Sequence, residues 1–234
     1  MLGDYKEVLR KNANQGDFIF LDPPYLPISV YSDFKRYTKE QFYEEDHHEL
    51  AELVRELVNR GCYIIHTNSN HPLVHELYNG FNIQVVKTRR NVNSVGTKRT
   101  GEDVIVTAKP PFIQNIRVIP KELNPQVKRF PSTRFMGSKQ KLLGHIQEVT
   151  SGLNFQSVAD IFSGSSAVSY YFKSIGKQVF SNDYMALAAN YSKALIENNS
   201  IRLDLTKAEN LLNDNGNNDF FVEKTFNGLY FSDE

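Results

Sequence analysis

Phe18-Ile19-Phe20-Leu21-Asp22-Pro23-Pro24-Tyr25 is the stretch of sequence that predicts most about the fold. Four apolar residues in a row are typical of a buried strand, and the two prolines cannot extend it, because proline lacks an amide donor and fixes its own φ. We therefore expect a turn at the carboxyl end of a strand, where open α/β sheets bind ligands. The Asp22 carboxylate, the proline carbonyls and the Tyr25 ring would suit a flat ring bearing an exocyclic amine. An ordinary turn with a surface tyrosine is the alternative.

A second informative block lies far downstream. Residues 157–162 predict a short buried strand, the Ser163-Gly164-Ser165-Ser166 segment a turn, and the apolar spacing after it a helix. A strand, a glycine turn and a helix form a unit in which the backbone approaches a nucleotide closely. Residues 178–182 predict the next strand, and Asp183 follows about 20 residues past the turn, where an acid can accept from ribose hydroxyls. A plain βαβ unit without a ligand is the alternative.

Four segments together carry a resemblance to a known family. They are residues 22–25 (Asp-Pro-Pro-Tyr), residues 134–139 (Arg-Phe-Met-Gly-Ser-Lys), the Asp-x-Phe-x-Gly pattern within residues 157–165, and Asp183. This set resembles the Dam-like DNA adenine methyltransferases, which methylate an exocyclic nitrogen with S-adenosylmethionine. The resemblance covers most of the chain. It implies an α/β fold, with a Rossmann-like S-adenosylmethionine-dependent methyltransferase sheet and helices on both faces.

The resemblance also implies roles for individual residues. The target amine would donate to Asp22 and to the Pro23 carbonyl, and Tyr25 would stack on a base flipped out of the duplex. No metal is required. The implied catalytic residues are Asp22, Pro23, Pro24 and Tyr25. The implied cofactor-binding residues are Phe135, Gly137, Lys139, Asp160, Phe162, Ser163, Gly164, Ser165 and Asp183.

Two positions depart from the family pattern. Ser166 stands where the family has a second glycine, and serine does not reach positive φ cheaply, so either this position is helical or cofactor affinity suffers. Phe135 stands where the family often has a tyrosine, which keeps the apolar ring and removes a hydroxyl.

Charge is balanced overall but unevenly distributed. The chain has 234 residues, with 27 basic and 27 acidic side chains. We expect a basic loop between two antiparallel strands, residues 81–88 and 103–109, and segregated charge of this kind can bind phosphates. Solvated surface charge without a partner is the alternative. The DNA-binding residues predicted for this loop are Arg89, Arg90, Lys98 and Arg99.

Other residue types exclude some classes of protein. No apolar stretch is long enough to cross a bilayer. Cys62 is the single cysteine, so a disulfide within the chain is excluded, and its apolar strand predicts a buried thiol. His71 and His75 have the spacing of two ligands on one helix face, but a third ligand is not evident, so we expect no metal site.

The order of the segments divides the chain. We expect a catalytic half in residues 1–109, a proline-rich linker in residues 110–133, and a cofactor-binding half in residues 134–234 that stops before a target-recognition region. In the Dam-like family the cofactor segments come first. We therefore favour an origin as the end of one methyltransferase followed by the start of a second, as in tandem methylases of type IIS systems. A permuted single domain is the alternative.

Both explanations lead to one expectation for the sheet. Each half alone would leave an open hydrophobic edge, so the halves should complete one sheet. Its predicted parallel strands are residues 18–22, 62–67, 157–162 and 178–182.

The predicted function is methyl transfer from S-adenosylmethionine to adenine N6 in double-stranded DNA. We expect a bacterial or phage protein that acts in the cytoplasm, with a cognate restriction endonuclease as a candidate partner. Two alternatives stay open at this point. The chain could be a non-catalytic fragment that binds only cofactor or DNA, or it could be an RNA amino-methyltransferase.

Overall fold

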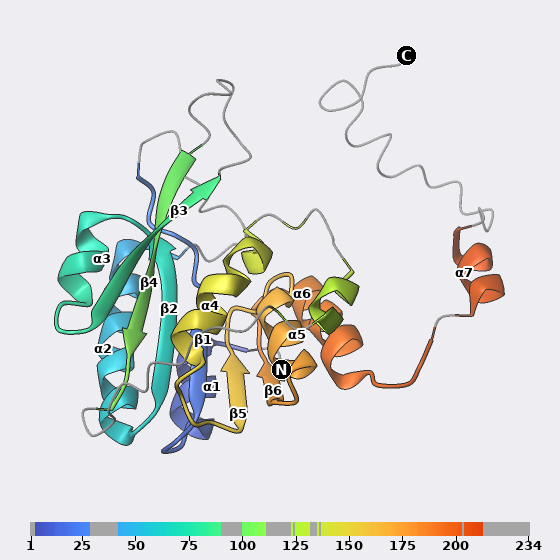
Figure 1. Cartoon of the computed structure of the whole chain (residues 1–234), viewed down its shortest axis with the longest axis horizontal. Coiled ribbons are helices and arrows are strands. Elements are labelled where there is room, and N and C mark those ends of the chain that lie inside the picture. Colours follow the sequence, from blue (N-terminus) through green and yellow to red (C-terminus); the bar gives the residue numbers. More distant parts are fainter. Residues whose placement is uncertain are drawn as a thin grey trace, which may run out of the picture. The chain divides into compact units, whose positions relative to one another are not determined.

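One six-stranded sheet organises the part of the chain that the computed structural model describes (Figure 1). Its strand order is β3-β4-β2-β1-β5-β6. The strands are β1 (Phe18–Leu21), β2 (Tyr63–Ser69), β3 (Asn82–Arg89), β4 (Thr100–Ala108), β5 (Ser157–Asp160) and β6 (Gln178–Ser181). Strands β2, β1, β5 and β6 are parallel, whereas β4 runs antiparallel to both β2 and β3. The expectation that the two halves complete one sheet is confirmed.

The described residues are 3–28, 42–89, 100–110, 123, 125–131, 135, 137–202 and 204–212. The chain divides into a unit up to Asn198 and a second unit, Asn199–Glu234. In the second unit the structure describes α7 (Leu205–Leu212), whose first turn is capped by the Asp204 side chain, which accepts from the Thr206 amide at 2.9 Å. No helix among the described residues is long and apolar enough to span a membrane.

Helices cover both faces of the sheet (Figure 1). Successive side chains of a strand point to opposite faces, so Ile19 and Leu21 belong to one core and Phe18 and Phe20 to the other. The first core is covered by α1 (Tyr5–Asn12), α2 (Glu44–Arg60) and α3 (Pro72–Leu77). The second is covered by α4 (Leu143–Thr150) and α5 (Ala167–Ser174). The predicted helices on both faces are confirmed.

The helix α2 follows directly from its sequence pattern. Leu50, Val54 and Leu57 recur at helical spacing and are fully buried against the sheet. Gly61 ends the helix with φ of 101°, a left-handed conformation that glycine adopts without steric cost.

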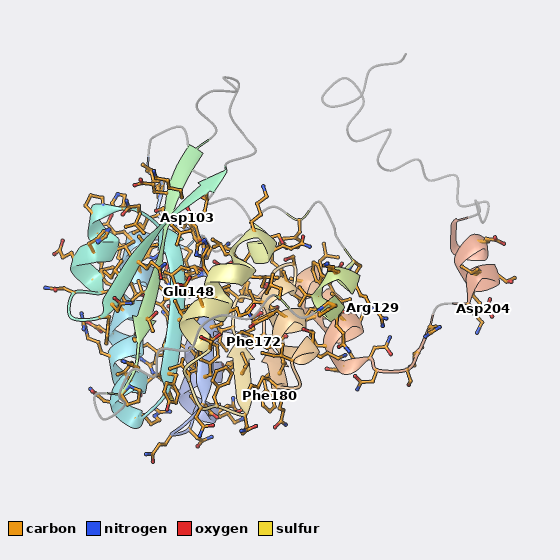
Figure 2. All side chains as sticks on the ribbon, in the orientation of Figure 1. Asp103, Arg129, Glu148, Phe172, Phe180 and Asp204 are labelled. Atoms are coloured by element: carbon orange, nitrogen blue, oxygen red, sulfur yellow. The ribbon has the colours of Figure 1, made fainter. Side chains whose placement is uncertain are left out.

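The strand β1 lies at the centre because it pairs with strands from both halves. Phe18 is opposite Tyr63 of β2 and opposite Val158 of β5. All four β1 residues are buried, which explains why the strand is a continuous apolar run and not an alternating one. At the sheet edge the case is the opposite, because Phe180 of β6 is 43% exposed, whereas Phe172 of α5 is fully buried. Both side chains are labelled in Figure 2.

Short elements complete the described part of the chain. They are η3 (Pro125–Arg129), η4 (Lys139–Leu142), α6 (Ala186–Ser192) and the π-helical η5 (Lys193–Glu197). Within the predicted linker, Val127 and Phe130 are buried, and the Phe130 ring lies 5.5 Å from that of Tyr170. The Cys62 thiol is buried as expected, and burial raises its pKa to about 11.

Candidate active site

Two turns meet where the parallel strands end. Asp22 follows the last residue of β1, and Asp160 is the last residue of β5. Phe20 is opposite Asp160 in the register of these neighbouring strands, so the two acids lie at the same edge of the sheet. Open α/β sheets bind their ligands at this carboxyl edge. We name residues 22–26 the catalytic turn and residues 163–166 the glycine turn.

Asp22 is held by groups from two other elements. Its Oδ1 accepts from the Thr67 hydroxyl of β2 at 2.5 Å, and its Oδ2 lies 2.7 Å from the Lys139 ammonium of η4. Burial raises the pKa of Asp22, while the charge and hydrogen bond of Lys139 and the Thr67 hydroxyl oppose that shift. Asp22 is therefore a largely buried carboxylate that is paired with one cation.

Lys139 connects the catalytic turn with the segment predicted to bind cofactor. Besides its pair with Asp22, its Nζ donates to the Gly137 carbonyl at 2.6 Å and lies 4.6 Å from the centre of the Tyr25 ring. A cation over an aromatic face is attracted by the ring quadrupole. The resemblance predicted a cofactor contact for Lys139, and the structure adds a contact with the catalytic acid that the sequence did not indicate.

Tyr25 presents its ring beside this ion pair. Burial raises the pKa of its hydroxyl well above the ordinary value, and the carboxylates of Asp22 and Asp103 raise it further. The hydroxyl lies near Asp22 and Thr67, but among the described residues it makes no hydrogen bond of good geometry. Pro23 is buried and Pro24 exposed. The ring, and not the hydroxyl, is thus the defined feature of this residue.

The glycine turn brings backbone close to an aromatic ring. Gly164 has φ of 46°, and a Cβ at this position would lie 3.2 Å from Cε1 of Phe135. The Gly164 amide donates to Oδ2 of Asp183 at 2.8 Å, and the Met185 amide donates to Oδ1 at 2.8 Å. Burial raises the pKa of Asp183, and these amides oppose the shift. The segment with Phe135, the turn and the acid after β6 therefore form one cluster.

Serine hydroxyls hold the glycine turn. Ser166 adopts φ of 60°, so the position is left-handed and not helical. Its hydroxyl lies 2.6 Å from that of Ser192 in α6, which also lies 2.9 Å from the Ser163 hydroxyl. The Ser165 hydroxyl donates to the Ser138 hydroxyl at 3.0 Å. These bonds explain how a serine is retained where the family pattern has a glycine.

Asp160 lies beneath the turn with one oxygen satisfied. Its Oδ2 accepts from the Ser169 amide at 3.1 Å and from the Ser169 hydroxyl at 2.6 Å, which ties β5 to the first turn of α5. Its Oδ1 is buried and has no hydrogen-bond partner among the described residues. Burial raises the pKa of Asp160 to about 7, and the neighbouring Asp22 and Asp183 charges add to the shift.

Phe162, a predicted cofactor residue, lies among other aromatic side chains of the first core. Its ring centre lies 5.3 Å from that of Tyr5 in α1 and 6.1 Å from that of Phe42. The side chain thus packs with the core under α1 and α2.

The predicted DNA-binding residues cannot be placed in the site. Arg90, Lys98 and Arg99 lie outside the described residues, and for Arg89 only the backbone, at the end of β3, is described. Their role stays a prediction.

Both histidines with metal-like spacing have other contacts. His71 caps α3, because its Nδ1 accepts from the Leu73 amide at 3.2 Å, and His75 Nε2 lies 2.6 Å from the Asn70 side-chain oxygen. In the described parts of the chain, no group of three or more His, Cys, Asp or Glu side chains is arranged to hold a metal ion.

Sequence reasoning missed several residues that support the site. Thr67, Ser138 and Ser192 all make side-chain contacts with the two turns. For Thr67 a signal existed, because a run of polar residues, Thr67-Asn68-Ser69, ends a strand whose other residues are mostly apolar. Single hydroxyls such as Ser192 carry no comparable signal.

Comparisons with known proteins agree with this geometry. A family described as D12 class N6 adenine-specific DNA methyltransferase matches residues 1–92 and 135–234. The chain is 38% identical over 108 residues to type II methyltransferase M1.LlaDCHI of Lactococcus lactis subsp. cremoris, covering 46% of this chain and 38% of that protein. It is 31% identical over 99 residues to DNA adenine methylase of Escherichia coli K12, covering 42% and 36%. The match therefore spans well under half the length of these curated relatives.

A solved structure extends the likeness to the whole sheet. The M1.HpyAVI complex with S-adenosylmethionine aligns with a TM-score of 0.52 and 15% identity, covering 85% of this chain and 98% of that one. An alignment of this extent includes both halves. The fold is that of the S-adenosylmethionine-dependent methyltransferases, as the resemblance implied.

Proposed function

The chain belongs to the D12 class N6 adenine-specific DNA methyltransferase family, and we propose that it transfers a methyl group from S-adenosylmethionine to the N6 amine of adenine in double-stranded DNA. The observation that carries this proposal is the 2.7 Å contact between Asp22 and Lys139. It joins the predicted catalytic residues and the predicted cofactor segment in one site, although the two lie in different halves of the sequence.

The residues around the glycine turn fit the cofactor. The buried Oδ1 of Asp160 lacks a partner among the described residues, and a cofactor ammonium would supply one. The left-handed Gly164 leaves backbone accessible beside the Phe135 ring, and Asp183 retains lone pairs for ribose hydroxyls. An ammonium has three donors, so Lys139 can keep its two contacts and still meet a carboxylate. When bound, the cofactor supplies an electrophilic methyl group on a sulfonium.

Asp22 would act on the target amine by hydrogen bonding. An adenine amine is a weak nucleophile because its lone pair is delocalised into the ring. Hydrogen bonds from N6 to Asp22 and to the Pro23 carbonyl would favour a tetrahedral nitrogen with its lone pair directed at the methyl group, which is catalysis by position and electrostatics. Lys139 supports this role, because a nearby cation favours the ionised, accepting form of Asp22.

The target base must leave the duplex to reach these groups. Inside the double helix, its amine is paired and its ring is stacked, so we propose that the base flips and that the Tyr25 ring replaces its stacking partners. The relatives named type II methyltransferases support a cognate restriction endonuclease as partner. Relatives from Lactococcus lactis subsp. cremoris and Escherichia phage P1 support action on DNA in a bacterial cytoplasm.

Methyl transfer from labelled S-adenosylmethionine to duplex DNA, followed by nucleoside analysis, tests the proposal. We expect label on adenine N6, and we expect Asp22→Ala to abolish it while leaving cofactor affinity nearly unchanged. Tyr25→Ala should weaken capture of the flipped base by about 1–3 kcal/mol, the usual contribution of base–aromatic stacking. Tyr25→Phe is the matched control and should be far milder, because its hydroxyl lacks a well-formed hydrogen bond.

Three results would contradict the proposal. Label on cytosine N4 would change the substrate, and transfer to RNA alone would favour the RNA alternative. Cofactor binding without any transfer would favour a non-catalytic chain.

A further inference from the structure

The catalytic turn has few backbone amides with which to hold its shape. Pro23 and Pro24 have no N–H group, so within residues 22–26 only Asp22, Tyr25 and Leu26 have amides that could hold the turn. A turn that must place a carboxylate and a ring for catalysis therefore needs anchors from outside. The residues that end β2 supply them.

Thr67 anchors the first residue of the turn. Its hydroxyl donates to Oδ1 of Asp22 at 2.5 Å, and the Thr67 side chain is fully buried. A hydroxyl that donates to a carboxylate fixes one oxygen in space, which leaves the other oxygen, Oδ2, facing Lys139. The contact sets the rotation of the carboxylate and not only its position.

Asn68 and Ser69 anchor the last residue of the turn. The Leu26 amide donates to Oδ1 of Asn68 at 3.0 Å, and the Ser69 hydroxyl donates to the Leu26 carbonyl at 2.6 Å. Both polar groups of the Leu26 backbone are therefore bound by side chains of β2. Because successive strand residues point to opposite faces, Asn68 reaches the turn from one face of the sheet, and Thr67 and Ser69 from the other.

A buried histidine lies beneath Asn68. Nε2 of His66 lies 3.5 Å from the side-chain nitrogen of Asn68, and the His66 ring stacks on Tyr78 at 4.6 Å. Burial lowers the pKa of His66 to about 3, so its ring is neutral near neutral pH and can accept from an amide. Asn68 Oδ1 also accepts from the Ser69 amide at 2.8 Å, which fixes the amide group further.

We infer that Thr67, Asn68 and Ser69 are positioning residues for methyl transfer, because they hold the catalytic turn at both ends and so set Tyr25 and the Asp22 carboxylate relative to each other. This inference rests on the proposed function for its catalytic meaning. It depends on one geometric observation. Three consecutive, buried polar side chains of β2 all bind residues 22–26. We assign none of the three a direct role in the reaction, because their contacts here are with residues 22–26.

Matched threonine variants test the first anchor. Thr67→Val removes the hydroxyl at constant shape, and Thr67→Ser keeps it. Thr107→Val is the control, because Thr107 lies in the neighbouring strand β4 and its hydroxyl is buried without a hydrogen-bond partner in the described structure. We expect kcat to fall about 10- to 100-fold in Thr67→Val, the loss for one hydrogen bond to a charged group, with the dissociation constant of S-adenosylmethionine unchanged. Thr67→Ser and Thr107→Val should retain kcat.

The pH profile separates positioning from general stability. The groups that act on the charge of Asp22 are Lys139 of η4, Thr67 of β2, Tyr25 of its own turn and Asp160 of β5, and the Asp103 carboxylate of β4 acts on Tyr25. Removing the Thr67 donor disfavours the ionised form of Asp22, which raises its pKa. The acid limb of the kcat profile should therefore move to higher pH in Thr67→Val and not in Thr107→Val.

Two readouts do not depend on activity. They distinguish a failure of the proposed function from a failure of the positioning role. Carbon NMR of the Asp22 carboxyl should show a higher pKa in Thr67→Val than in Thr107→Val. Exchange of the Leu26 amide should accelerate about tenfold or more in Asn68→Ala, with exchange in the α2 core unchanged. Absence of methyl transfer in the wild-type chain with these two effects present would overturn the proposed function alone. Equal kcat, Asp22 pKa and Leu26 exchange in the variants and the control would overturn the positioning role.

Discussion

The turns after β1 and β5 follow neighbouring strands, yet they are held in place by different kinds of contact. The catalytic turn is stiffened by two prolines, and side chains of β2 bind it from outside. The glycine turn is left-handed at Gly164 and Ser166, and hydroxyls of its own serines bind it to α6 and to Ser138. The first turn presents side chains, and the second presents backbone.

This difference follows from what each turn would have to do. A turn that offers a carboxylate and a ring can lose its amides, because the working groups are side chains. A turn that lets a nucleotide approach its backbone must avoid side-chain bulk, so it needs glycine and small hydroxyl residues. Lys139 contacts the first turn from the segment next to the second, so its substitution should disturb the site most.

The largest effect is expected from Lys139→Met. The side chains of Lys139 and Asp22 are largely buried, and removing the cation leaves an uncompensated carboxylate. We expect a loss of about 3–5 kcal/mol in the free energy of unfolding near pH 8, measured with urea. The loss should shrink toward pH 5, because the pKa of Asp22 is then raised above its unfolded value and protonation relieves the penalty.

The double variant Asp22→Asn/Lys139→Met is the control for this result. Without the carboxylate the missing cation costs little, so the double variant should recover most of the stability. A double variant as unstable as Lys139→Met would mean that the lysine stabilises the site by packing alone.

A smaller, pH-dependent effect is expected from Asp160→Asn. The pKa of Asp160 is raised from 3.8 to about 7, so between these values the folded state binds more protons than the unfolded state. Its contribution to stability is therefore greatest at low pH and is lost as the pH rises to about 7. Relative to wild type, the free energy of unfolding of Asp160→Asn should rise by about 2–3 kcal/mol between pH 5 and pH 8. A difference that does not change with pH would show that Asp160 is ionised throughout.

The smallest effect is expected at Ser166 of the glycine turn. Ser166→Ala keeps the left-handed strain and loses the contact with Ser192, so it should cost about 1–2 kcal/mol. Ser166→Gly also loses that contact but relieves a strain of about 1 kcal/mol, so it should be nearly neutral. Thermal unfolding of both variants measures the difference. If the two variants unfold at the same temperature, the backbone of this position is not strained.

Much of the fold could be predicted because it depends on local patterns. A continuous apolar run predicted β1, shorter runs of strand-forming residues predicted β2, β5 and β6, and the proline and glycine residues marked the turns after β1 and β5. That the two halves belong to one sheet followed from the need to cover open edges. The π-helical η5 and the packing of Phe130 could not be predicted, because neither has a periodic signal in the sequence.

The site was predictable in its parts and not in its connections. Asp22, Gly164 and Asp183 stand in recognisable motifs, and the structure brings all three to one edge of the sheet. The pair between Lys139 and Asp22 joins residues from different halves, so it depends on how η4 lies on the sheet. The origin of the chain from a tandem methyltransferase stays a prediction, with a permuted domain as its alternative.

The central place of β1 has a consequence for how the chain acquires its structure during synthesis. β1 leaves the ribosome before β5, which must follow about 140 residues later before both edges of β1 are paired. Until then, an uncharged run of four apolar residues offers unpaired backbone to any other strand. Pairings between distant residues also form slowly, because a long loop must close first. The nascent protein is therefore expected to depend on chaperones during the interval in which residues 22–160 are made.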